Sequence, residues 1–166
     1  MLHKQEKIGL EIRKLNHEMN RNLELQVKAE GIDEVTLMHG WIMRYLYENR
    51  EKEIYQKDIE KHFSIGRSTV TSIIQLMEKK GFIERQAVQS DARLKKVLLT
   101  GKGEKTHETI EALIIQLNQN MMEGIEPEEL QTFLEVLSKI RQNIERKREE
   151  KKEKTEKNRK GKCGND

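Results

Sequence analysis

Apolar residues recur at every third or fourth position over long stretches at both ends of the chain, which is the period of an amphipathic helix. One such stripe lies in residues 1–30 and two lie in residues 104–145, where Pro127 separates them. A proline followed by Glu128 and Glu129 is typical of the first turn of a helix, because its missing N–H costs nothing there and the acids face the helix dipole. The stripes consist of Ile8, Ile12, Leu15, Met19 and Leu23, then Ile110, Leu113, Ile114, Leu117 and Met121, then Leu130, Phe133, Leu134, Leu137, Ile140 and Ile144.

The first stripe stops at Gly31, and Asp33 is placed to cap a second helix. The charged residues 48–53 end this helix, and Ile54 is then in position for a short strand. Apolar residues at helical spacing predict the inner face of the helix, with Trp41 and Arg44 beside it. The predicted inner face comprises Val35, Met38, Ile42, Tyr45 and Leu46.

The pattern changes from helical to alternating within residues 55–100. A short helix over 56–63 and a turn at 64–66 lead into a helix over 67–80, which Gly81 can end in the left-handed conformation. Residues 82–88 and 95–100 read as antiparallel strands, with 89–94 as the hairpin tip. The fold class is therefore mainly α with a small β-wing. This layout is a winged helix-turn-helix, which reads one DNA groove with a helix and grips the backbone beside it.

The amino-acid composition restricts the classes of protein to which this chain can belong. Of the 166 residues 34% are hydrophobic and 37% are charged, so the core is thin. The chain has no apolar run of membrane-spanning length, no signal-peptide pattern and one cysteine, Cys163, which together predict a cytoplasmic protein without an internal disulfide. No nucleophile–base pair is evident, and Gly101-Lys102-Gly103 is too short for a phosphate loop, so an enzyme has no supporting constellation.

Positive charge is concentrated in two places, although the net charge is only +3. Residues 55–100 hold nine Lys or Arg against five Asp or Glu, and residues 146–166 hold ten against five. Phosphate contact requires such patches, but lysines also solubilise surfaces, and charge alone does not separate the two. The basic 146–166 tail lacks an apolar stripe, so we expect frayed helix passing into disorder. A non-specific DNA arm, a partner-binding tail and a solubility device all stay open for it, as does the role of Cys163.

Several motifs in the central region resemble the multiple antibiotic resistance regulator (MarR) family. They are Ser68-Thr69-Val70-Thr71 at the start of the 67–80 helix, residues 76–85 at its end, and Asp91-x-Arg93 followed by Leu99-Thr100 in the wing. With the order and lengths of the flanking helices, the resemblance covers about residues 5–145. It implies one domain over 1–145, with a DNA-binding head at 55–100 and dimerisation helices at 1–30 and 104–145. Gly66 stands where the family commonly has a serine cap, and the tail is longer than usual.

Residues away from the apolar stripe of the 67–80 helix, and basic residues of the wing, are the candidates for DNA contact. Arginine can bind guanine, glutamine can bind adenine, and serine or threonine can reach bases or phosphates. Arg93 suits a narrow minor groove, and the resemblance implies that Asp91 holds it in place. A merely solvated polar face is the alternative. The candidates are Arg67, Ser68, Thr69, Thr71, Ser72, Gln75, Arg85, Asp91, Arg93 and Lys95.

Three long amphipathic helices cannot all bury their stripes on a head of about 65 residues, so the sequence predicts a homodimer, with an intramolecular bundle as the alternative. The expected function is a sequence-specific transcription regulator that binds palindromic double-stranded DNA, against an architectural DNA-binding protein without sequence preference. The resemblance implies a repressor whose small-molecule effector binds between head and dimer base. The lining candidates, for which core packing is the commoner role, are Met19, Met38, Trp41, Arg44 and Tyr45.

The sequence gives little support for a bound metal ion or cofactor. His17, His39 and His107 have carboxylates near them in the sequence, but no pair of histidines has the close spacing of zinc ligands on a helix face. We therefore expect no metal and no cofactor, and we expect these histidines to lie at the surface or in an interface.

Overall fold

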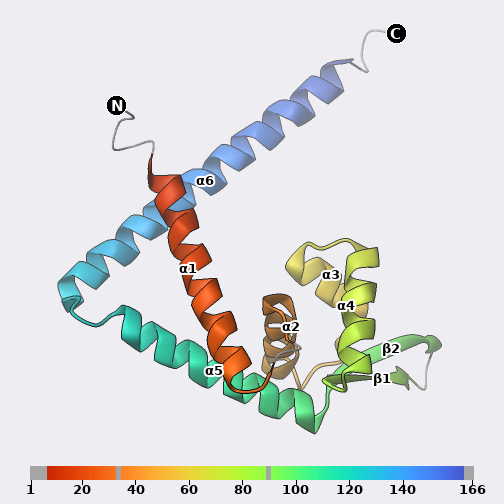
Figure 1. The fold of residues 1–166 in the computed structure, drawn as a ribbon. Helices are drawn as coiled ribbons and strands as arrows, with labels where there is room; N and C mark the ends of the chain where they lie inside the picture. The colour runs from red at the N-terminus through yellow and green to blue at the C-terminus, as the bar shows by residue number, and fades with distance from the viewer. Residues whose placement is uncertain (1–6, 33–34, 89–90, 163–166) are drawn as a thin grey trace. The chain divides into compact units, whose positions relative to one another are not determined.

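The computed structural model describes residues 7–32, 35–88 and 91–162, and the side chains of all of these except 88, 91–93 and 156–162. The chain divides into two compact units, Met1–Met121 and Met122–Asp166. The first contains five helices and a two-stranded antiparallel sheet within its described residues, and the second contains one helix (Figure 1). The elements are α1 (Ile8–Ala29), α2 (Leu37–Glu48), α3 (Gln56–Phe63), α4 (Arg67–Lys79), β1 (Ile83–Val88), β2 (Asp91–Leu99), α5 (Gly101–Met121) and α6 (Pro127–Lys162).

The core of the first unit gathers where α2, α3 and α4 meet the base of the wing. The α4 stripe of Val70, Ile74 and Met77 is fully buried, as its helical spacing predicts. Burying a side chain of this size contributes about 1.5–3 kcal/mol, so this small cluster supplies much of the energy that holds α4 in place. The buried apolar residues are Leu23, Val27, Ile42, Met43, Leu46, Ile54, Ile59, Val70, Ile74, Met77, Phe82, Ile83, Val97 and Ile110.

The buried face of α2 differs from the predicted one. It consists of His39, Ile42, Met43 and Leu46, which have regular helical spacing. A search for apolar residues at helical spacing misses this stripe because one of its members is a histidine. The predicted members Val35, Met38 and Tyr45 are only half-buried. The inner face of α2 is therefore rotated toward His39 and Met43.

The start of α2 explains why a histidine lies inside. Thr36 is the N-cap: its side chain accepts a hydrogen bond from the His39 backbone N–H at 3.4 Å, and His39 Nδ1 accepts one from the Thr36 N–H at 3.2 Å. This is a capping box with histidine in the place usually held by glutamate or glutamine. The predicted cap, Asp33, lies outside the described residues.

The three histidines were expected at the surface or in an interface between subunits, but two of them are buried within the chain. His39 is 2% exposed, and His107 is 5% exposed with its ring 4.5 Å from that of Tyr47. His17 is exposed on α1, as expected. Packing between α2 and α5 buries His107, and the helical spacing within α5 does not reveal that contact.

The wing is a hairpin in which Ile83 pairs with Leu99 at its base and Val88 pairs with Asp91 at its far end. The second strand begins at Asp91, so it extends into the region predicted as the hairpin tip. The strand predicted at Ile54 is reduced to one bridge between Tyr55 and Lys96, next to a hydrogen bond of 2.7 Å from Val97 N–H to the Ile54 carbonyl.

A tight joint links the end of α4 to the start of α5. Gly81 ends α4 with a φ of 75°, the left-handed conformation that the sequence predicts. The Thr100 hydroxyl donates a hydrogen bond of 2.6 Å to the Gly81 carbonyl. A Cβ on Gly103 would lie 2.0 Å from the Phe82 carbonyl oxygen, so only glycine allows this approach.

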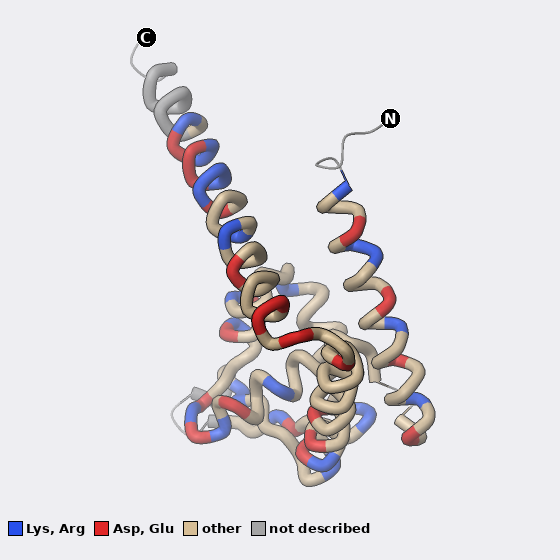
Figure 2. The backbone as a smooth tube through the Cα atoms, turned by 90° about the vertical axis from the view of Figure 1, so that its left-hand side faces the viewer, with Lys and Arg blue, Asp and Glu red and all other residues tan. Residues whose placement is uncertain are grey.

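The second unit is dominated by α6, which continues without a break to Lys162. The sequence predicted a frayed helix passing into disorder beyond residue 145, and the structure is helical there as far as Lys162. Lysine, arginine and glutamate are strong helix formers, and Lys147 pairs with Glu150 at 2.9 Å along the helix, so a helix persists without an apolar stripe. Figure 2 shows both charge signs along its length. No helix in the described parts of the chain could cross a membrane.

Candidate nucleic-acid interface

The first turns of α4 present polar side chains to solvent. The helix begins after Gly66, which supplies no side-chain cap, so unpaired backbone N–H groups and the positive end of the helix dipole face outward. Such a helix start favours phosphate groups. Five of the predicted contact residues of α4 are exposed around it, on the side opposite the buried stripe: Arg67, Ser68, Thr69, Ser72 and Gln75.

A groove of about 510 Å³ lies between α3, the start of α4 and the wing. It brings Arg67 and Thr71 of α4 together with Arg85 and Lys95 of the wing, four residues that the sequence analysis named separately. Four lining residues are basic and one, Glu60, is acidic, so the groove has the sign that phosphates require. The lining residues are Tyr55, Gln56, Lys57, Glu60, Arg67, Thr71, Arg85, Leu94, Lys95 and Val97.

The sequence analysis missed the contribution of α3 to this groove. Gln56 and Lys57 lie on the first turn of α3, and Lys57 Nζ is 5.4 Å from the centre of the Tyr55 ring. The available signal was the position of Lys57 on the face of α3 opposite Ile59, which is fully buried. The short helix α3 lies next to α4. Its polar face, opposite the buried Ile59, was therefore a candidate for DNA contact.

Thr71 is engaged within the protein. Its hydroxyl donates a hydrogen bond of 2.8 Å to the Arg67 carbonyl and accepts one of 2.7 Å from Gln56 Nε2. Gln56 Nε2 also donates to Glu60 Oε1 at 2.9 Å, so one amide joins α3 to α4. The structure therefore supports a positioning role for Thr71, with Gln56 as the residue that fixes the angle between the two helices.

Arg85 also has an internal partner. Its Nε donates a hydrogen bond of 2.9 Å to Glu78 Oε2, which ties the wing to the last turns of α4. The hydrogen bond from Arg85, followed by the charges of Arg85 and Lys95, holds the pKa of the Glu78 carboxyl below its usual value despite partial burial. The pKa of Arg85 is raised by the same bond. Arg85 thus orients the wing, whereas Lys95 is exposed and available to phosphates.

The remaining wing candidates are Asp91 and Arg93. Both belong to β2, just after the irregularity in strand pairing between Ala87 and Val88. Their side chains lie outside the described part of the structure. The minor-groove contact of Arg93 and the supporting role of Asp91 therefore stay predictions from the sequence.

The predicted effector site corresponds in part to a pocket between α1, α2 and α5. Trp41 and Arg44 line it, but Met19, Met38 and Tyr45 do not: Met38 packs against the core, and Tyr45 stacks on His62 at 4.2 Å. The cavity has a volume of about 30 Å³, enough for one water molecule. Its lining residues are Leu23, Glu24, Val27, Val35, Thr36, Leu37, Gly40, Trp41, Arg44, Ile110, Glu111 and Ile114.

Arg44 closes one side of this pocket through two carboxylates. Its Nε donates a hydrogen bond of 2.8 Å to Glu48 Oε1, and its Nη1 lies 3.6 Å from Glu111 Oε1 on α5. The bond to Glu48, followed by the charge of Glu111, raises the pKa of Arg44. The described residues contain no group of three His, Cys, Asp or Glu side chains arranged to hold a metal ion.

Comparison with known proteins agrees with this geometry. The MarR family model matches residues 34–94, which include α2, α3, α4 and most of the wing. The multidrug efflux pump regulator MepR of Staphylococcus aureus is 25% identical with a TM-score of 0.68, covering 82% of this chain and 98% of its own. MepR has also been solved in a complex with DNA.

Two further solved structures share the fold. The heme sensor protein PefR of Streptococcus agalactiae, in complex with heme, is 25% identical with a TM-score of 0.63, covering 87% of this chain and 95% of its own. The transcription regulator MarR of Oenococcus oeni is 27% identical with a TM-score of 0.60, covering 81% of this chain and 98% of its own. The MarR family model therefore matches the head of this chain, and the chain shares its fold with these regulators.

Proposed function

We propose that this protein is a homodimeric, cytoplasmic transcription regulator that binds a palindromic DNA operator and acts as a ligand-responsive repressor. The observation that carries the proposal is the exposed polar start of α4 beside a groove with four basic side chains. In a winged helix, this end of the recognition helix enters the major groove while the wing contacts the adjacent backbone or minor groove. The DNA complex of MepR supports the same use of the fold here.

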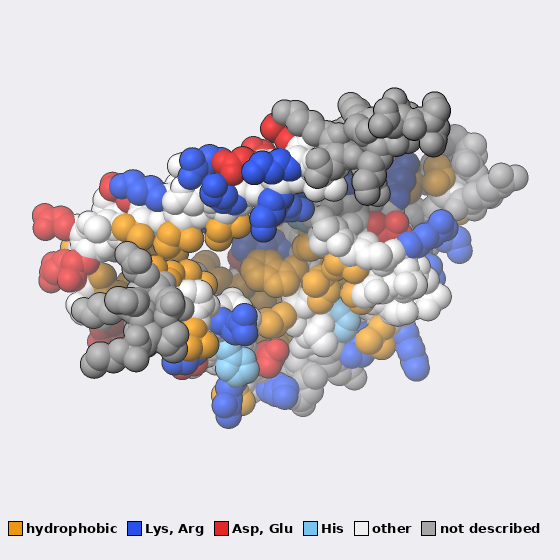
Figure 3. Space-filling view, turned by 90° about the horizontal axis from the view of Figure 1, so that it is seen from above, with side chains coloured by type: hydrophobic (Ala, Val, Ile, Leu, Met, Phe, Trp, Pro, Cys, Tyr) orange, Lys and Arg blue, Asp and Glu red, His pale blue; other side chains and the backbone are white. Residues whose placement is uncertain are grey.

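The proposal of a dimer rests on apolar residues that the chain leaves at its surface. Ile8, Ile12 and Leu15 on α1 are 43–48% exposed, and Phe133 and Leu134 on α6 are 50% and 52% exposed. Figure 3 shows hydrophobic side chains, in orange, exposed at the surface. Patches of this kind mark association surfaces, and a second copy in two-fold symmetry matches a palindromic site.

The proposal of an effector rests on the pocket between α1, α2 and α5. Ligand sites for drug-sized molecules have volumes of roughly 300–1,000 Å³, so the present cavity is closed and an effector would have to part these helices. Because α5 is joined to the end of α4 at Thr100 and Gly103, parting them would move the recognition helix. Such a ligand regulates only if it binds the two arrangements with different affinity. The heme-bound PefR shows that a relative accepts a small molecule.

Selection of bound sequences from a random DNA pool tests the proposal. The expected result is an enriched palindrome with half-sites about one helical turn apart. Arg67→Ala should weaken binding to that site by about 1–3 kcal/mol, while an exposed lysine on α5, Lys105→Ala, serves as the control. Binding without sequence enrichment would favour an architectural DNA-binding protein instead.

A further inference from the structure

The part of α6 beyond residue 145 carries its charges on separate faces. At 3.6 residues per turn, Lys147, Arg148, Lys151 and Lys152 fall within an arc of about 140° that also contains Ile140 and Ile144. Glu149, Glu150 and Glu153 point to the opposite side of the helix. The apolar stripe of α6 therefore continues as a basic stripe.

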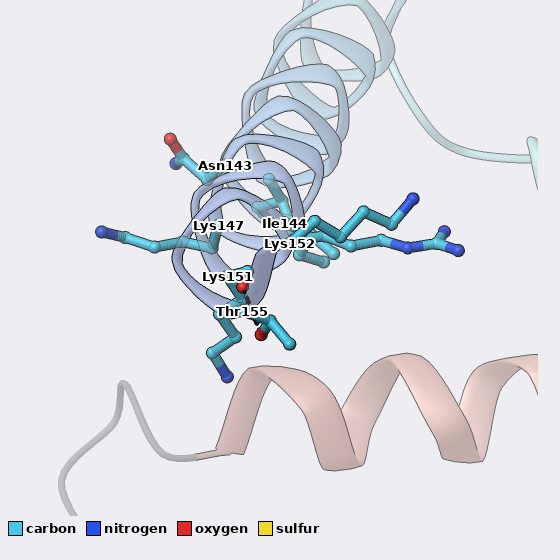
Figure 4. Close-up of a pocket in the computed structure, with 8 residues that line it drawn as sticks. Asn143, Ile144, Lys147, Lys151, Lys152 and Thr155 are labelled. Atoms are coloured by element: carbon cyan, nitrogen blue, oxygen red, sulfur yellow. Dashed lines mark hydrogen bonds between the residues drawn. The ribbon is translucent and has the colours of Figure 1, made fainter. Parts of the chain in front are cut away.

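Figure 4 shows Lys147 and Lys152 pointing to either side of the helix, with Lys151 and Thr155 between them. The stripe holds four cations and, among its described residues, no carboxylate; its members are Ile140, Asn143, Ile144, Lys147, Arg148, Lys151, Lys152 and Thr155. Thr155 donates a hydrogen bond of 2.8 Å to the Lys151 carbonyl. The four cations Lys147, Arg148, Lys151 and Lys152 form the basic face of α6.

The cations of the basic face are largely unneutralised. Lys147 is paired with Glu150 at its edge, which lowers the pKa of that carboxyl, and in the described part of α6 the other three make no ion pair. Lys147 and Lys151 are four residues apart, as are Arg148 and Lys152, and like charges at this spacing destabilise a helix. An anionic partner along this face would remove the repulsion between the cations. A surface whose role is solubility alone is better served by positive and negative side chains interspersed with each other.

The composition of the extension favours one class of anion. Residues 145–162 contain no apolar side chain, and a helix that binds in a lipid interface needs an apolar face to insert. The row of arginine and lysine that follows Ile144 contains no apolar residue, which suits the phosphates of a nucleic-acid backbone. Binding of this face to the phosphates would neutralise them and release counterions.

We propose that the basic face of α6 binds phosphates of double-stranded DNA outside the bases read by α4. This inference rests on the proposed DNA-binding function and adds a second contact surface to it. The contact supplies affinity that depends on salt and carries no sequence preference, because phosphates are the same at every base pair.

The test compares two full-length variants with equal loss of charge. The first is Lys147→Gln with Arg148→Gln and Lys151→Gln on the basic face. The control is Lys139→Gln with Arg146→Gln and Lys157→Gln, three positions that the same helical count places on the opposite side of α6. Glutamine keeps the helix propensity, and circular dichroism checks that α6 stays helical.

The measured quantity is the affinity for a duplex carrying the selected site with flanking DNA, between 50 and 200 mM salt. For each copy of α6 that contacts DNA, the loss of three phosphate contacts should reduce the slope of log K against log salt by about 2–3. Between 50 and 200 mM salt, the affinity of the wild type should therefore fall about 40-fold more than the affinity of the basic-face variant. The control should keep most of the wild-type slope, and the preferred sequence should be the same in all three proteins.

Several outcomes would overturn the inference. Equal slopes for all three proteins, or equal loss in both variants, would show that the basic face makes no specific phosphate contact while leaving DNA reading by α4 intact. Loss of binding to phosphatidylserine vesicles in the basic-face variant, with DNA binding unchanged, would assign the face to membranes. A wild-type protein that binds no DNA at any salt concentration would overturn the proposed function as well.

Discussion

The same sequence signal has opposite outcomes in α4 and in α6. Both helices carry apolar residues at helical spacing, yet Val70, Ile74 and Met77 of α4 are fully buried, whereas Ile144 of α6 is 64% exposed. None of the described residues of α6 is buried. A stripe is buried only where other elements surround it, and α4 has α3 and the base of the wing within reach. An apolar period therefore predicts a helix in both cases but does not say what covers it.

This difference separates two sources of stability. The head gains its energy within one chain, so its unfolding should not depend on protein concentration. Leu23 of the α1 stripe is buried in this core, but Ile8, Ile12 and Leu15 of α1 and Phe133 and Leu134 of α6 are exposed. We expect these exposed positions to gain energy from a partner, and stability from a partner rises with concentration.

Removing residues 122–166 should have the largest effect. The first unit retains its core without them, since its buried residues all lie before residue 122. We expect a folded protein with weaker self-association and an operator affinity roughly 10²–10⁴-fold lower, because one linked half-site is lost. Sedimentation and DNA titration measure the two effects. A truncated protein that dimerises and binds like the full chain would show that α6 is dispensable for both.

Paired alanine substitutions compare the stripes directly. Ile74→Ala should lower the free energy of unfolding by about 2–5 kcal/mol at any protein concentration, because it leaves a cavity in a closed core. Leu134→Ala should leave the unfolding of the monomer nearly unchanged and weaken the dimer. Denaturant titrations at two protein concentrations separate these results, and a concentration-dependent loss for Ile74→Ala would contradict the comparison.

Arg93→Ala should weaken operator binding by about 1–3 kcal/mol without altering stability. The reason is its place in the wing motif, which the sequence predicts to enter a minor groove. Binding measured at one fixed salt concentration, with Lys105→Ala as the control, checks this. Equal affinity of the Arg93 variant and the wild type would remove this residue from the interface.

Glu78→Gln should have the smallest effect, below about 1 kcal/mol, because the Glu78–Arg85 pair is partly exposed. The folded-state pKa of Glu78 lies below its usual value of 4.5, so the pair stabilises the protein above that pH and loses its contribution as the pH falls through the folded-state pKa. Wild type and variant should differ between pH 5 and 8 and converge in stronger acid. A difference that grew on acidification would contradict the sign of this linkage.

Local structure of the head followed from the sequence alone. The short helix predicted over 56–63 is α3 with the same ends, and the helix predicted over 67–80 is α4, ending one residue earlier. Gly81 adopts the predicted left-handed conformation. Helical period, turn residues and a terminal glycine act within a few residues of each other, so a linear pattern is enough to reveal them.

The assembly of the groove was decided only by the tertiary structure. The hydrogen bond from Gln56 to Thr71 joins residues 15 apart, and the bond from Arg85 to Glu78 joins the wing to α4. Both give a residue that was predicted to contact DNA a partner within the protein, and the packing of α2 buries a histidine expected at the surface or in an interface. These outcomes depend on the angles at which helices and strands meet. Periodicity within one helix shows which face is apolar, but the partner of each polar side chain is set by elements far away in the chain.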